Sequence, residues 1–250
     1  MSADTAETIE NADITVREVH YEAVGRHLIG RLAIPPGSGP FAGVLIAHEG
    51  PGLDDVMRDR ANQLAKLGYC AFALDYHGDA LPFADRDAMM ARLTSLISDS
   101  DRTRSLANAA LEILLTQAPV DPERVAIIGY CFGGTVGLEL GRAGADVKAI
   151  VGFHPGLNNT RPSDSNNITG KVLMCLGDAD PITTIVQRQS FEAEMRATKV
   201  DWQVHLYAGV EHSFTHPYAD LAGMAGIKYD AAADRRSWRA MLDLFAETID

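Results

Sequence analysis

The sequence is poor in cysteine and has no long apolar run. Its 250 residues include 3 cysteines, Cys70, Cys131 and Cys175. So sparse and odd-numbered a set excludes a disulfide framework in a chain of this length. No Cys-x-x-Cys pair or Cys/His cluster indicates zinc, and we expect no metal. No stretch of about eighteen apolar residues is present, so the sequence predicts no membrane span.

Basic residues are also scarce. Lys and Arg number 22 against 34 Asp and Glu, which gives a net charge of −12. No Lys/Arg-rich run is present, so we expect no nucleic acid partner. The first 13 residues are polar and acidic and lack the features of a signal peptide, so we expect a cytoplasmic protein.

Linkers, repeats and low-complexity segments are absent too. Hydrophobic residues make up 46% of the chain, which is enough for a full core. One large α/β domain fits this length. The sequence therefore predicts a single domain over residues 1–250, with the oligomeric state left open.

Short apolar runs alternate with helical periodicity along most of the chain. Residues 14–19 and 28–34 are typical of an antiparallel hairpin with one wet face. Further strands are expected at 43–48, 70–74, 125–128, 147–153, 171–177 and 202–207, and helices near 55–68, 89–96, 106–114, 184–198 and 232–248. This pattern predicts the α/β class, with a mostly parallel, doubly wound sheet and helices on both faces.

Residues 127–137 read Ile-Ile-Gly-Tyr-Cys-Phe-Gly-Gly-Thr-Val-Gly. This is the outline of the strand–turn–helix motif in which many hydrolases hold a serine, with Cys131 in the serine's place. Free cysteine is often a buried core residue, which is the interpretation for Cys70 and Cys175 inside apolar strands. For Cys131 the position at a strand end and the flanking glycines, which permit a sharp turn, favour a nucleophile.

The helix expected after Cys131 begins with free backbone amide groups. Such amides favour a thiolate and can hold the oxyanion of an acyl-transfer transition state. We expect one oxyanion donor to be the N–H of Phe132. The second should come from the loop after strand 43–48, where the N–H of Gly50 is the candidate.

Two more candidate residues follow other strands. Asp180 comes after strand 171–177, and His212 comes after strand 202–207. Chemistry in parallel sheets gathers at the carboxyl ends of the strands, so these side chains are expected near Cys131. His212 would take the thiol proton while Asp180 orients the imidazole. Asp178 is the alternative acid.

Together these residues resemble the dienelactone hydrolase family of the α/β-hydrolase fold. The matching stretches are Gly-Tyr-Cys-Phe-Gly-Gly at 129–134, Gly-Asp-Ala-Asp at 177–180 and Glu-His-Ser-Phe at 211–214. The resemblance extends from strand 43–47 to the last helix. It implies a Cys-His-Asp triad that hydrolyses a small ester, lactone or dienelactone-like substrate through a thioester, without a cofactor.

The family also has a glutamate after the early strand, close to the nucleophile, and Glu49 matches it. The resemblance implies that this carboxylate keeps the resting thiol neutral and helps to deprotonate it when substrate arrives. A carboxylate near a thiol does oppose thiolate formation, because like charges disfavour each other.

The chain departs from the family where arginines grip the carboxylate of dienelactone. Residues 76–79 are Tyr-His-Gly-Asp at the first of these positions, and His216 stands at the second. Histidine is a weak replacement for a bidentate arginine. A neutral or differently shaped ester is therefore as consistent with the sequence as an anionic lactone. His77, His154 and His216 lie near strand ends and are expected to contact the substrate.

Three other functions are weaker readings of the same residues. A non-catalytic binding or regulatory protein of this fold is the main alternative, because a fold does not guarantee a function. A redox-sensing thiol would need a resolving cysteine, and the other two cysteines lie inside strands. A dinucleotide-binding enzyme is disfavoured because residues 133–137 lack Gly-x-Gly-x-x-Gly spacing.

Overall fold

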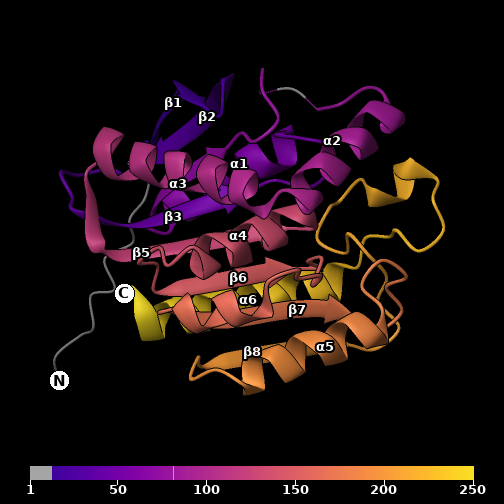
Figure 1. Cartoon of the computed structure of the whole chain (residues 1–250). Coiled ribbons are helices and arrows are strands. Elements are labelled where there is room, and N and C mark those ends of the chain that lie inside the picture. Colours follow the sequence, from indigo (N-terminus) through magenta and orange to yellow (C-terminus); the bar gives the residue numbers. More distant parts are fainter. Residues whose placement is uncertain (1–12, 81) are drawn as a thin grey trace, which may run out of the picture.

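The computed structural model describes residues 13–80 and 82–250. Residues 1–12, which bear on the expected lack of a signal peptide, lie outside the described part of the chain. The described residues form one eight-stranded sheet with helices packed on both of its faces (Figure 1). The predicted α/β class with a mostly parallel, doubly wound sheet is therefore confirmed.

The strands lie in the sheet in the order β1-β2-β4-β3-β5-β6-β7-β8. β1 pairs with β2, and β2 with β4, in antiparallel register, whereas every pairing from β4 to β8 is parallel. The bounds are Thr15–Ala23 (β1), Arg26–Ile34 (β2), Phe41–Ala47 (β3), Cys70–Leu74 (β4), Val120–Tyr130 (β5), Ala149–Phe153 (β6), Lys171–Gly177 (β7) and Trp202–Tyr207 (β8).

Five of the six α-helices in the described part of the chain begin at a side chain that caps them, and the exception is α4, which follows Cys131. Asp54, for example, accepts a hydrogen bond from the Met57 amide at 2.9 Å at the start of α1. The α-helices are Asp55–Lys66 (α1), Arg86–Ser98 (α2), Ser100–Gln117 (α3), Phe132–Arg142 (α4), Ile185–Arg196 (α5) and Ala231–Thr248 (α6), and the short 3₁₀ helices are Pro162–Asn167 (η1) and Ala219–Ala222 (η2). Among the described residues, no helix is long and apolar enough to cross a membrane.

Successive residues of the central strands face two separate cores. Leu45 packs into the core shared with α2, α3, α4 and α5, whereas its neighbours Val44 and Ile46 pack into the core shared with α1 and α6. All three side chains are fully buried. Because both faces of the sheet are covered, the strand sequences are continuous apolar runs.

The structure departs from the predicted elements in two places. β5 begins at Val120 rather than at residue 125, and it pairs with Phe41 of β3 across a shift in register. The polar residues 121–124 conceal this extension from a reading based on apolar runs. The predicted loop 156–169 contains the short helix η1, which is too brief to leave a periodic pattern.

The parallel strands end along one edge of the sheet, and the candidate residues follow these ends. This edge therefore brings together positions far apart in the sequence: Glu49 follows β3, His77 follows β4, Cys131 follows β5, His154 follows β6, Asp180 follows β7 and His212 follows β8. In Figure 1, α2 and the yellow-orange segment after β8 lie at one end of the molecule.

Candidate active site

Cys131 occupies a strained turn between β5 and α4. Its φ of 52° and ψ of −119° are unusual for any residue other than glycine. The turn is possible because Gly129 and Gly133, two residues to either side of Cys131, have no side chains. A Cβ on Gly129 would collide with the carbonyl of Gly133, and a Cβ on Gly133 would collide with the carbonyl of Ala47. The local sequence therefore holds the thiol at the tip of the turn.

The thiol of Cys131 is accessible, unlike the other two. Cys131 is half-buried and lines a cavity of about 740 Å³. Cys70 and Cys175 are buried, and burial raises the pKa of each to about 12. Cys131 is therefore the thiol placed for reaction with a small molecule.

Two backbone amides lie beside the cavity with their N–H groups free. Phe132 is the first residue of α4, and Gly50 lies in the loop after β3, and both line the cavity. Among residues 13–80 and 82–250, neither N–H donates a hydrogen bond. These are the two amides that the sequence analysis selected as oxyanion donors.

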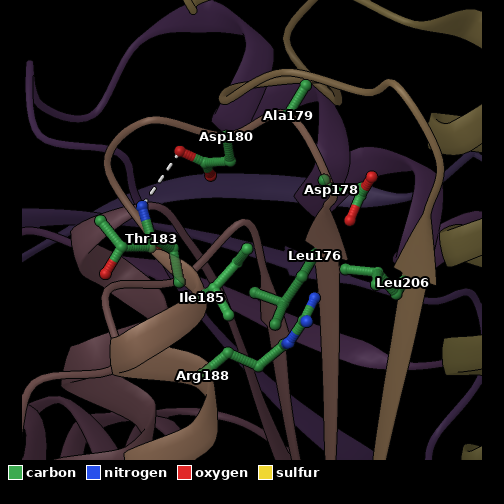
Figure 2. A pocket seen from close by; sticks show the side chains of 10 residues that line it. Leu176, Asp178, Ala179, Asp180, Thr183, Ile185, Arg188 and Leu206 are labelled. Atoms are coloured by element: carbon green, nitrogen blue, oxygen red, sulfur yellow. Dashed lines mark hydrogen bonds between the residues drawn. The ribbon is translucent and has the colours of Figure 1, made fainter.

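His212 and Asp180 form a buried hydrogen-bonded pair. Nδ1 of His212 lies 2.7 Å from Oδ2 of Asp180. The other carboxylate oxygen accepts hydrogen bonds from the amides of Ile182, at 2.7 Å, and Thr183, at 3.1 Å (Figure 2). Asp178, the alternative acid, is exposed. The geometry therefore pairs His212 with Asp180.

The imidazole of His212 also borders the cavity that contains the thiol. His212 and Cys131 line the same cavity, and Nε2 of His212 is buried without a hydrogen-bond partner in the described part of the chain. Burial alone would lower the pKa of His212. The negative charge of a Cys131 thiolate and the hydrogen bond with Asp180 outweigh burial and raise this pKa well above its usual value.

Glu49 lies in the same cavity as a buried carboxyl group. Its Oε2 accepts a hydrogen bond from Ser213 at 2.9 Å, and its Oε1 lies 3.6 Å from Nε2 of His154. Burial raises the pKa of Glu49, although His216 and His212 oppose the shift. Sequence reasoning missed Ser213 as a partner. Its place directly after His212 in the Glu-His-Ser-Phe stretch is the signal that could have identified it.

His154 lies behind the site and is not among the residues that line the cavity. It is fully buried, its Nε2 lies 2.8 Å from Oγ1 of Thr215, and its ring centroid is 5.0 Å from that of His212. Burial lowers its pKa well below the usual value, so the ring is neutral. The expected substrate contact is thus replaced by packing against Glu49 and His212.

His77 also does not line the cavity, and it packs against the loop after β3 that contains Gly50. Its Nε2 is 2.8 Å from the carbonyl oxygen of Gly50. Burial lowers its pKa to about 4, so the ring is neutral and donates this bond. The predicted substrate contact is again replaced by a structural one, because the ring turns toward the loop backbone.

Tyr76 and His48 support the same loop, a role that the sequence did not indicate for either residue. The hydroxyl of Tyr76 donates to the carbonyls of His48, at 2.7 Å, and Glu49, at 3.1 Å. Nδ1 of His48 donates to the carbonyl of Glu49 at 2.7 Å. The Glu49 carbonyl belongs to the peptide whose N–H is that of Gly50. These bonds therefore fix the orientation of one candidate oxyanion donor.

His216 does line the cavity, but its charge is already paired. Its Nε2 lies 2.8 Å from Oδ2 of Asp54. Burial opposes protonation of His216, but the hydrogen bond with Asp54 raises its pKa overall. Among the described residues lining the cavity, Arg86 is the one arginine or lysine, and it is exposed. The site thus has no buried, unpaired cation for a substrate carboxylate.

A second cavity of about 300 Å³ is lined by the residues that follow β7 and by the start of α5 (Figure 2). Asp178, Asp180 and Arg188 line it, whereas Cys131 and His212 do not. Within residues 13–80 and 82–250, no group of three His, Cys, Asp or Glu side chains could hold a metal ion.

Comparison with known proteins links this geometry to a family. A sequence model described as the dienelactone hydrolase family matches residues 28–249. The solved structure of m3DLH is 42% identical, covers 95% of this chain and 99% of its own, and superposes with a TM-score of 0.91. A dienelactone hydrolase-like promiscuous phosphotriesterase from metagenomic libraries is 40% identical, with 96% and 100% coverage and a TM-score of 0.91.

A more distant relative comes from Bradyrhizobium. It is named probable 2-oxo-3-(5-oxofuran-2-ylidene)propanoate lactonase and is 25% identical over 205 residues. The match covers 78% of this chain and 82% of the relative. The expected resemblance and the α/β-hydrolase fold are both supported by these similarities.

Proposed function

Because the chain belongs to the dienelactone hydrolase family, whose members hydrolyse esters and lactones, we propose that it cleaves a carboxylic ester or lactone through a thioester on Cys131. The observation that carries this proposal is the position of His212. Its imidazole is held by Asp180 at 2.7 Å on one side and meets the cavity of Cys131 on the other.

In the first half-reaction, His212 takes the proton of the Cys131 thiol and the sulfur attacks the substrate carbonyl carbon. The carbonyl π electrons move onto oxygen, and the resulting oxyanion is bound by the N–H groups of Gly50 and Phe132. When the intermediate collapses, the C–O bond to the alcohol breaks and His212 returns its proton to the departing oxygen. The products are a Cys131 thioester and an alcohol; for a lactone the alcohol stays attached to the acyl group.

In the second half-reaction, His212 takes a proton from water and the hydroxide attacks the thioester carbonyl. The same two amides hold the oxyanion. The C–S bond then breaks, and the thiolate recovers the proton from His212. The net change is one ester or lactone bond and one water molecule converted into a carboxylic acid and an alcohol.

Hydrolysis of p-nitrophenyl acetate tests this proposal directly. We expect Cys131→Ala to lose at least about 1,000-fold in kcat/KM, because the nucleophile is removed. We also expect a mass increase of one acetyl group on Cys131 when the enzyme is quenched during turnover. Cys70→Ala is the matched control and should retain wild-type kinetics, since Cys70 lies buried inside β4.

Full activity in Cys131→Ala would refute the proposal. An inactive wild-type chain that still binds esters would instead favour the alternative of a non-catalytic binding protein. Iodoacetamide provides an independent check, because it should modify Cys131 and leave Cys175, which is fully buried, unmodified.

A phosphotriester is a second candidate substrate. The structural relative described as a promiscuous phosphotriesterase is 40% identical and covers 96% of this chain. Among the residues that the structure describes, the cavity has no buried, unpaired cation suited to an anionic substrate. Attack of the thiolate on phosphorus would expel an aryloxide and leave a phosphorylated Cys131. Release of p-nitrophenol from a diethyl p-nitrophenyl phosphate, lost in Cys131→Ala, is the expected result.

A further inference from the structure

The cavity that contains Cys131 has an arm along the helix that follows the nucleophile. Thr135 and Glu139 of α4 line it, at one and two four-residue steps beyond Cys131. This spacing puts all three on one face of the helix. At about 1.5 Å per residue, Glu139 lies about 12 Å from Cys131 along the helix axis, which sets the scale of the arm.

The opposite wall of this arm is apolar and comes from α2. Met89, Leu93, Leu96 and Ile97 line the cavity there. Leu93 reaches the oxyanion loop, since a Cβ on Gly50 would lie 3.0 Å from its Cδ1. The wall therefore begins next to the position of the scissile carbonyl and continues along α2.

The far end of the arm is closed by polar groups that are already paired. The carboxylate of Glu139 accepts hydrogen bonds from Arg104 at 2.7 Å and from Arg142 at 3.0 Å. Arg104 also bonds Asp164, and Arg142 also bonds Glu194. This cluster carries more acidic than basic groups, so it disfavours a substrate with a carboxylate at that end.

The direction of reaction assigns this arm to the acyl group. The leaving alcohol must face His212, because that imidazole gives it a proton. The oxyanion must face Gly50 and Phe132. The tetrahedral carbon also carries the Cys131 sulfur and the acyl chain. The acyl chain then points away from His212, toward α2 and Thr135.

We propose that the groove between α2 and α4 is an acyl-binding subsite for neutral, extended apolar acyl groups of medium length. This rests on the proposed ester hydrolysis at Cys131 and adds the acyl specificity of that site. Met89, Leu93 and Ile97 are the specificity-determining side chains, and the polar end at Glu139 sets the upper limit of chain length.

A series of p-nitrophenyl esters that differ only in acyl chain tests the assignment. Full burial of a methylene favours binding by about fourfold, so the six methylenes added between acetate and octanoate have an upper limit of roughly 4,000-fold. Because the groove is partly open, we expect kcat/KM to rise by roughly 60-fold, about twofold for each methylene. It should then fall for palmitate, which is longer than the arm. The p-nitrophenyl monoester of a dicarboxylic acid should be a poorer substrate than the neutral ester of equal length.

Substitutions on α2 locate the subsite. Ile97→Trp puts a large ring at the side of the arm remote from the thiol, and should lower the ratio of octanoate to acetate kcat/KM at least tenfold. Ser95→Trp is the matched control, because Ser95 is exposed on the same helix and does not line the cavity. It should keep the wild-type ratio, and thermal melting should show both variants folded.

The outcomes separate this inference from the proposed function. An active, Cys131-dependent enzyme that prefers acetate, or whose ratio is unchanged in Ile97→Trp, would overturn the acyl subsite and leave ester hydrolysis intact. Dependence on the length of the alcohol in alkyl acetates, but not on acyl length, would overturn it as well. Ester hydrolysis that survives in Cys131→Ala would instead refute the proposed function.

Discussion

The hydroxyl of Tyr76 is the residue-scale feature with the clearest catalytic consequence. It is buried and donates to the carbonyls of His48 and Glu49. The second of these bonds orients the Glu49–Gly50 peptide, which carries the Gly50 N–H. In Tyr76→Phe we expect kcat for p-nitrophenyl acetate to fall about tenfold to 100-fold with little change in KM, because the oxyanion donor is mispositioned.

Tyr130 supplies a matched control for this substitution. Its side chain is also fully buried, yet its hydroxyl has no hydrogen-bond partner within the described residues. Tyr130→Phe should therefore leave kcat within about twofold and leave stability unchanged or slightly higher. Equal effects in the two variants would show that the Tyr76 hydroxyl has no special role in positioning.

Glu49 provides a second prediction at the scale of single residues. If its buried carboxylate restrains the resting thiol, Glu49→Gln should make Cys131 react faster with iodoacetamide at neutral pH, since a negative charge has been removed. Ester turnover should fall at least about tenfold if Glu49 also helps to deprotonate the thiol, as the family resemblance implies. Ser213→Ala, which removes only the hydrogen bond to Glu49, should show a smaller change in alkylation rate. Alkylation at the wild-type rate in Glu49→Gln would contradict this role.

At the scale of elements, the guanidinium of Arg142 links three helices. It is fully buried on α4 and bonds Glu139 of the same helix, Glu194 of α5 and Ser165 of η1. Its removal leaves the carboxylate of Glu194 without a cation and that of Glu139 with Arg104 alone. We expect Arg142→Met to lower the free energy of unfolding by about 3 to 5 kcal/mol in urea denaturation.

Arg196 on α5 is the control for this network. It forms an ion pair with Glu192 at 2.9 Å, but its side chain is 61% exposed. Arg196→Met should change the free energy of unfolding by less than about 0.5 kcal/mol, because exposed pairs contribute little. A loss in Arg142→Met no larger than in Arg196→Met would show that the buried network does not stabilise the helix junction.

For the whole molecule, buried histidines predict how stability depends on pH. Burial lowers the pKa of His48, His77 and His154, so all three are neutral in the folded chain. Below pH 6.5 the unfolded chain binds protons that the folded chain does not bind. As pH is lowered below 6.5, we expect the free energy of unfolding to fall by about 1.4 kcal/mol per pH unit for each of these groups.

For His77 this loss continues until about pH 4, its folded value. Urea denaturation at pH 7, 6 and 5 measures the slope, and His77→Phe should reduce it by about a third. His20→Gln should leave it unchanged, because His20 is exposed. His212 acts in the opposite range, since its raised pKa stabilises the fold at lower pH and that contribution is lost as pH rises above 6.5. If the free energy of unfolding did not fall between pH 7 and pH 5, the assignment of buried neutral histidine rings would be wrong.

Most of the sheet could be predicted from the sequence because both of its faces are buried. Strands at 70–74 and 171–177 have the predicted bounds, since apolar runs there end at turn residues, whereas the edge strand at 202–207 has them because apolar and polar residues alternate. β5 was harder because its first half carries charged side chains at the edge of the core. That half is defined by pairing with β3, a long-range contact with no local signal.

The placement of site residues could be predicted only as far as topology fixes it. Cys131, Asp180 and His212 follow parallel strands, so their convergence is a consequence of the fold. The orientations of His77 and His154 depend on local backbone and on which carbonyl or hydroxyl each ring meets. His154 has a φ of 42°, in the left-handed region, and no local sequence pattern predicts this conformation.

The contact of Leu93 with the Gly50 loop limits how the substrate specificity of this protein can change by mutation. In the proposed mechanism, the Leu93 side chain both lines the acyl groove and packs against the loop that carries the Gly50 oxyanion donor. A mutation there would change both substrate preference and turnover. Ile97, one turn after Leu93, and Met90, one turn before it, are half-exposed and do not contact Gly50, so mutations there can alter substrate preference alone. Divergence among relatives should therefore concentrate at the outer turns of this helix and spare the turn beside residue 50.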